Sequence, residues 1–249
     1  MSERGGSPQE LGLASATGAP NELGYPRLHL RRTDSTNSRA QELAAGGAPH
    51  GTLVTAAEQT SGRGRQGRTW TAPAGRALLC SLVIREPSRL LPLAAGVAVA
   101  RTAGPRARVK WPNDVLVQGR KLAGILVEGR PQERWAVLGI GVNVALREHD
   151  FPPEQRARAT TLGLEPAAIE PILGRLLEAL SQSLGAPEAA VLEAVRQRDA
   201  LRGRPIRWSD REGIAEGIDD EGRLLVRLAG GETAVLDSGE VHLVAQNDR

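Results

Sequence analysis

The pattern of apolar and polar residues changes near Leu201, and this change constrains the fold of the chain more than any single motif does. Beyond residue 203, apolar and polar residues alternate in short segments, as at Leu224, Val226 and Leu228. Segments that contain glycine, such as Gly230-Gly231 and Ser238-Gly239, separate these strands, and glycine is a residue of tight turns. Short alternating strands joined by turns are typical of a small β-barrel. We therefore expect a barrel-like domain over residues 201–249.

The part of the chain before this boundary mixes helical and strand patterns. Apolar residues from Ile169 to Leu184 recur at helical spacing, which predicts an amphipathic helix. The apolar runs from Leu78 to Ile84 and from Trp135 to Val142 have the length of buried strands. These patterns predict an α+β fold. Further strands are expected at 28–30, 51–58, 115–117 and 122–127, with one more near Val109. Further helices are expected at 35–45, 90–102 and 188–198, and a loop at 144–165.

Residues 1–24 are rich in Gly, Ser, Ala, Pro and Glu and show no sustained period. This composition predicts a disordered tail. The start of the chain lacks the charged and apolar regions of a signal peptide, and no apolar run approaches the roughly 20 residues of a membrane span. We therefore expect a cytoplasmic protein without a membrane partner.

Composition excludes several classes of function. The formal charge is only +3, from 32 basic and 29 acidic residues, which does not demand a nucleic-acid partner. Cys80 is the single cysteine and lies in an apolar run. It has no cysteine to pair with, and no Cys/His spacing indicates zinc. We expect a buried, unreactive thiol.

The segment from Ser61 to Trp70 combines three arginines with three glycines and ends on a tryptophan. Glycine allows close approach of the backbone to a ligand, and arginine matches carboxylate or phosphate. The segment therefore fits a flexible loop that closes over an anionic small molecule. It fits equally an exposed segment that contacts nucleic acid, and this decapeptide alone does not decide between them.

Four further motifs accompany this loop in a fixed order: Asp34 to Asn37, Lys110 to Asp114, Lys121 to Glu128 and Gly139 to Asn143. Together with the arginine loop, this set resembles the bacterial biotin protein ligases. The resemblance extends from about Leu28 to the C-terminus. It implies a catalytic domain over residues 25–200, built as a mixed β-sheet covered by helices, like class II synthetases and biotin and lipoate ligases. It also implies an SH3-like domain over residues 201–249.

The same resemblance implies a two-step reaction. The biotin carboxylate attacks the α-phosphate of ATP to give biotinyl-5′-AMP and pyrophosphate, and an acceptor lysine then takes the biotinyl group. The expected acceptor is the biotin carboxyl carrier protein of acetyl-CoA carboxylase. Mg²⁺ is expected to arrive with ATP, held mainly by phosphate oxygens and water, with no protein metal site. Many family members carry a DNA-binding helix-turn-helix module, for which residues 1–24 leave no room, so we expect no DNA partner. Monomer and homodimer both stay open.

The residue roles that follow from the resemblance fall into three groups. The catalytic cations are Lys121, Arg65 and Arg63. The biotin-binding residues are Ser35, Thr36, Asn37, Gln59, Arg63, Gly64, Arg65, Lys121 and Gly124. The ATP-binding residues are Arg65, Arg68, Trp70, Asn113, Asp114, Lys121 and Asn143.

Simpler roles compete with some of these assignments. By position alone, Lys121 would be a strand-end lysine that points to solvent, and Ser35 would be an ordinary helix cap. The arginine loop is expected to be mobile until a bound anion offsets the repulsion among its arginines. The competing functions are a lipoate or octanoate transferase, a nucleic-acid-binding protein and an inactive biotin sensor.

Overall fold

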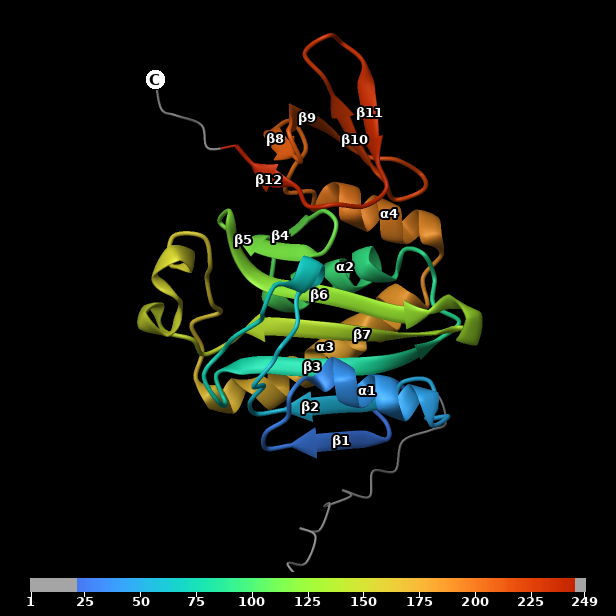
Figure 1. The fold of residues 1–249 in the computed structure, drawn as a ribbon, viewed down its shortest axis with the longest axis vertical. Coiled ribbons are helices and arrows are strands. Elements are labelled where there is room, and N and C mark those ends of the chain that lie inside the picture. The colour runs from blue at the N-terminus through green and yellow to red at the C-terminus, as the bar shows by residue number, and fades with distance from the viewer. Residues whose placement is uncertain (1–21, 245–249) are drawn as a thin grey trace, which may run out of the picture.

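The computed structural model describes residues 22–244, and its larger part is a seven-stranded sheet with helices on both faces (Figure 1). The strand order is β1-β2-β3-β7-β6-β5-β4. β1 and β2 are parallel, whereas the other neighbours are antiparallel, so the predicted mixed sheet is confirmed. The strands are β1 Arg27–Leu30, β2 Leu53–Ala56, β3 Ala77–Arg85, β4 Ala107–Lys110, β5 Asp114–Val117, β6 Arg120–Arg130 and β7 Trp135–Asn143.

The helices divide between the two faces of this sheet. Helix α1 (Thr36–Ala45) covers β3 and β7 on one face, while α2 (Leu91–Ala103) and α3 (Ile169–Leu184) lie on the other (Figure 1). Helix α2 is apolar over most of its length because it is packed between α3 and the sheet. Helix α4 (Glu188–Gln197) packs against α2. All four predicted helices are confirmed within one or two residues at their ends.

The C-terminal part is an antiparallel five-stranded sheet in the order β11-β10-β9-β8-β12. Its strands are β8 Pro205–Trp208, β9 Arg211–Ile218, β10 Leu224–Arg227, β11 Thr233–Leu236 and β12 His242–Leu243. Apolar residues of this sheet belong to the same core as α2 and α4. The indole nitrogen of Trp111 donates to the carbonyl of Gly222 at 3.0 Å, and this contact fixes the sheet against the turn before β5. The predicted SH3-like domain is thus present as a small sheet, and its boundary near Leu201 stays a prediction.

The predicted loop and the end of the predicted tail lie beside the larger sheet. Residues 1–21 of the tail lie outside the described residues. Its last three residues, 22–24, form a turn, in which the amide of Gly24 donates to the carbonyl of Gly51 at 2.9 Å. This turn is ordered because it packs beside the start of β2. The loop over 144–165 contains only short 3₁₀ turns, and it returns to the sheet where Ala159 bridges Lys121.

Cys80 lies in β3 with 1% of its surface exposed, so the predicted burial is confirmed. Burial raises the pKa of its thiol to about 12. Within residues 22–244, none of the helices has the length and apolar character required to cross a membrane.

Candidate active site

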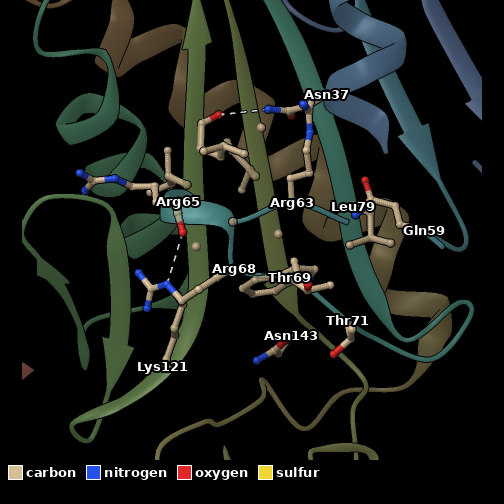
Figure 2. Close-up of a pocket in the computed structure, with 18 of the residues that line it drawn as sticks. Asn37, Gln59, Arg63, Arg65, Arg68, Thr69, Thr71, Leu79, Lys121 and Asn143 are labelled. Atoms are coloured by element: carbon tan, nitrogen blue, oxygen red, sulfur yellow. Dashed lines mark hydrogen bonds between the residues drawn. The ribbon is translucent and has the colours of Figure 1, made fainter. Parts of the chain in front are cut away.

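A pocket of about 300 Å³ opens on the α1 face of the sheet, beneath the arginine loop. Figure 2 shows Asn37 and Asn143 toward opposite ends of this pocket, with Arg63 and Arg65 between them. The first turn of α1 and strands β3, β6 and β7 supply the walls. Nearly all of the predicted site residues line it: Ser35, Thr36, Asn37, Gln59, Arg63, Gly64, Arg65, Arg68, Trp70, Asn113, Lys121, Gly124 and Asn143. Asp114 lies just behind them.

One end of the pocket is built by the buried start of α1. Ser35 is the N-cap residue, but its side chain makes no capping bond. Instead, the side-chain oxygen Oε1 of Gln59 accepts from the backbone N–H of Thr36 at 2.7 Å. Ser35 thus occupies the predicted N-cap position, but the capping hydrogen bond comes from Gln59 rather than from the hydroxyl of Ser35. This leaves the Ser35 hydroxyl available to a ligand.

The amide of Asn37 is held from both sides. Its Nδ2 donates to Oε2 of Glu128 at 2.7 Å, and its Oδ1 accepts from the Ser81 hydroxyl at 2.6 Å. A Cβ at Gly139 would collide with Oδ1 of Asn37, so glycine is needed opposite this amide. The result is a set of fixed polar groups that suits a ligand with both donors and acceptors.

The arginine loop is tied down by its own backbone and by two carboxylates. The amide of Gly64 donates to the carbonyl of Arg68 at 2.7 Å. Arg63 lies 3.1 Å from Glu128, and Arg68 pairs with Glu240 of the C-terminal sheet. We expected that only a bound anion would offset the repulsion among the arginines. That expectation is wrong, because Glu128 and Glu240 already supply negative charge.

Lys121 faces the pocket because of a β-bulge in β6. Leu116 pairs with Lys121 and Val115 with Ala123, so Leu122 is an extra residue on β6. A bulge re-aims the side chains that flank it, and here it puts Lys121 on the same face of the sheet as Asp114. The Lys121 Nζ lies 2.7 Å from Oδ1 of Asp114. The expectation of a solvent-pointing lysine, drawn from position alone, is therefore wrong.

Asp114 joins two lysines and lies close to Arg65. It is 8% exposed, and its Oδ2 lies 3.5 Å from Lys110 Nζ. Burial lowers the pKa of Arg65 from its ordinary value, and the charge of Asp114 opposes that shift. The guanidinium of Arg65 also donates to Oδ1 of Asn113 at 3.1 Å. Arg65 and Lys121 therefore form a half-buried cationic region, partly balanced by one carboxylate.

Trp70 lies across the floor of the pocket. The Lys121 Nζ is 5.8 Å from the centroid of its ring, which is within the range of cation–π attraction. A Cβ at Gly141 would lie 2.6 Å from Cε2 of this ring, so β7 needs a glycine there. Beyond Trp70, the amide of Asn143 donates to the carbonyl of Thr160 at 2.9 Å.

Sequence reasoning missed several residues of the site, among them Ser81, Glu128, Arg158 and Glu240. Glu128 ends the Lys121 motif and could have been found there. Glu240 lies in the connection between β11 and β12 and gave no local signal. Within residues 22–244, no group of three His, Cys, Asp or Glu side chains is arranged to hold a metal ion.

Comparison with known proteins agrees with this geometry. Residues 29–144 match the model of the biotin/lipoate A/B protein ligase family, and residues 203–244 match that of the biotin protein ligase C terminal domain. The biotin–[acetyl-CoA-carboxylase] ligase of Mycobacterium tuberculosis is 36% identical over 236 residues, which span 85% of this chain and 86% of that protein. The chain belongs to the biotin protein ligase family.

Further members of the family differ in length and in the part that aligns. The bifunctional ligase/repressor BirA of Bacillus subtilis is 43% identical over 152 residues, which are 56% of this chain but only 47% of that protein. This chain thus spans about half the length of that relative. The structure of the biotin protein ligase from Aquifex aeolicus in complex with biotin and ATP superposes with a TM-score of 0.76, at 28% identity. That superposition covers 88% of this chain and 99% of the other.

Proposed function

We propose that this chain activates biotin with ATP to biotinyl-5′-AMP and transfers the biotinyl group to a lysine of an acceptor protein. The observation that carries the proposal is that Lys121 and Arg65 line the same pocket as the buried polar end formed by Ser35, Thr36 and Asn37. Cations at the middle of the pocket and uncharged donors and acceptors at its end match a ligand with a carboxylate tail and a ureido ring. The relatives named as biotin ligases support this assignment.

The first step brings two anions together. A biotin carboxylate oxygen bonds to the α-phosphorus, and the bond from that phosphorus to the bridging oxygen of pyrophosphate breaks. Fixed cations lower the barrier for such a step because they meet the charge as it develops. Lys121 and Arg65 would neutralise the carboxylate and the α-phosphate, while Arg68 would contact the outgoing phosphates. Asn143 and Trp70 would line the adenine end, with Asn113 and Asp114 holding the cations in place.

The second step requires that the adenylate survive until the acceptor arrives. The acceptor amine attacks the acyl carbon of the mixed anhydride, forms an amide and releases AMP. Water would hydrolyse the anhydride, so the loop that carries Arg63, Gly64 and Arg65 must exclude it. We propose the biotin carboxyl carrier protein of acetyl-CoA carboxylase as the acceptor, in line with the name of the Mycobacterium tuberculosis relative.

Mg²⁺ would enter as part of the MgATP substrate. The carboxylate nearest the cations is Asp114, and it is already engaged by Lys110 and Lys121. The described donor set therefore fits a metal carried by phosphate oxygens and water rather than by a protein cage. A homodimer and the lack of a DNA partner stay predictions.

The test is the exchange of labelled pyrophosphate into ATP, with biotin, lipoate or octanoate as the acid. We expect exchange with biotin only, because the polar end of the pocket offers hydrogen bonds that a plain acyl chain cannot use. Exchange with lipoate or octanoate but not with biotin would show that the chain activates a different acid. A transferase, which needs no ATP, would give no exchange with any of the three. Exchange with none of the three acids would contradict the proposed activity.

A further inference from the structure

The carboxylate of Glu128 connects the two parts of the pocket that would hold biotin. Its Oε2 accepts from Asn37 Nδ2 at 2.7 Å and lies 3.1 Å from a guanidinium nitrogen of Arg63. The Glu128 side chain is 28% exposed, while Asn37 is 4% exposed. One carboxylate oxygen therefore contacts both the amide at the buried end of the pocket and the loop that closes over it.

This contact decides which way the Asn37 amide points. A side-chain amide has a donor end and an acceptor end of nearly the same shape. A carboxylate only accepts, so it selects the Nδ2 end of Asn37. The carbonyl of Leu126 also accepts from Nδ2, but at 3.5 Å it is the weaker of the two contacts. The Oδ1 end then faces the hydroxyl of Ser81 at 2.6 Å, and that hydroxyl must donate to it.

The assignment of hydrogen-bond donors and acceptors extends from Ser81 through Thr36 to Gln59. Each hydroxyl has a single proton, and the Ser81 hydroxyl lies 2.8 Å from that of Thr36. Because Ser81 donates its proton to Asn37, the two hydroxyls form a hydrogen bond only if Thr36 donates to Ser81. Oε1 of Gln59 then accepts from the backbone N–H of Thr36 at 2.7 Å. A chain of polar groups from Glu128 to Gln59 thus has one favoured arrangement of donors and acceptors, and Glu128 fixes its beginning.

We propose that Glu128 is a positioning residue for biotin recognition, which acts by fixing the amide of Asn37 and with it the donor and acceptor pattern that the ureido ring meets. This inference rests on the proposed function. The same carboxylate holds Arg63, so the order of the buried end and the closed position of the loop depend on one group. Glu128 itself does not react.

The first experiment replaces the carboxylate by an amide of the same shape. In Glu128→Gln the side chain at position 128 can present either end to Asn37, so both amide orientations become possible. We expect the Kd for biotin, measured by titration calorimetry, to rise about tenfold, which corresponds to the loss of a hydrogen bond to a charged group. The Kd for ATP should change less than about twofold, because Glu128 does not reach the phosphate end.

A matched control is Glu86→Gln. Glu86 pairs with Arg134 at 2.7 Å at the exposed far end of the sheet, so this variant also removes one carboxylate from an arginine pair. We expect it to bind biotin as the original protein does, since exposed ion pairs contribute little. Equal loss of biotin affinity in both variants would overturn the proposal, and so would an unchanged Kd in Glu128→Gln.

A second variant tests whether Glu128 acts through Asn37 rather than through Arg63. Asn37→Asp places two carboxylates against each other and should weaken biotin binding more than Glu128→Gln. The double variant Asn37→Asp with Glu128→Gln reverses the hydrogen bond, since the new amide at position 128 can donate to the new carboxylate at position 37. We expect the double variant to bind biotin more tightly than Asn37→Asp alone. Additive losses would overturn the proposed route.

Measurements on the unmutated protein distinguish a failure of this inference from a failure of the proposed function. If it binds biotin and carries out exchange while the Glu128 variants behave like the control, only the role of Glu128 fails. If the original protein does not bind biotin, the proposed function fails first.

Discussion

Oδ1 of Asp114 on β5 lies 2.7 Å from Nζ of Lys121 on the neighbouring strand β6. The two side chains share a face of the sheet only because Leu122 is an extra residue in β6. Without that bulge, Lys121 would point to the opposite face, since side chains alternate along a strand. The bulge in β6 therefore places Lys121, the cation on which the proposed chemistry depends, in the pocket.

The first prediction concerns that cation. Lys121→Ala should reduce biotin-dependent pyrophosphate exchange by at least about a hundredfold, because it removes a charge that would meet the developing negative charge. Lys121 is only partly buried, so the midpoint of thermal unfolding should move by only a few degrees. A folded variant with near-normal exchange would contradict the assigned role.

Arg65→Gly should release the adenylate before transfer. The arginine contacts Asn113 at 3.1 Å and lies among the lining residues of the pocket, so its loss opens the loop side. Biotinyl-5′-AMP should then escape and label lysines on an added bystander protein, detected by a streptavidin blot. Labelling of the bystander at the level of the original protein would show that Arg65 does not retain the intermediate.

Gly141→Ala tests the position of Trp70. The new Cβ would lie 2.6 Å from the indole ring, which must then move into the pocket. We expect adenylate formation to fall at least about tenfold, because a small misplacement in a site is costly. Gly174→Ala in α3 is the control, since no heavy atom lies within 4 Å of its added Cβ. It should retain exchange and be stabilised by roughly 0.5–1 kcal/mol.

The buried thiol gives a pH-dependent prediction. The pKa of Cys80 is about 12 in the folded chain, against 9.0 for an ordinary thiol. Between these values the unfolded chain binds fewer protons than the folded one, so this group makes stability fall as pH rises through that window. At pH 8 a thiol reagent should therefore modify Cys80 only after unfolding. Fast modification of the folded protein would contradict the burial of β3.

Local patterns in the sequence were enough to predict the helices and the strands of the larger sheet, whereas the pocket residues were predicted from the resemblance to biotin protein ligases. The spacing of the apolar residues from Ile169 to Leu184 predicted α3, and the motif residues lie together because α1, β6 and β7 are neighbours in the fold. The ion pairs between residues that are far apart in the sequence could not be predicted from local patterns. Arg68 pairs with Glu240, which lies between β11 and β12, and Arg63 pairs with Glu128 of β6. The bulge at Leu122 depends on the register of two strands, which no single stretch of sequence encodes.

Transfer of biotin to a protein is tested most directly by intact-mass spectrometry of an acceptor. The acceptor is a biotin carboxyl carrier domain, incubated with this protein, biotin and MgATP. We predict a gain of one biotinyl group on one lysine, and no gain without ATP or with Lys121→Ala. An acceptor whose mass stays unchanged in the complete mixture, while an established biotin ligase modifies it, would contradict the proposed function.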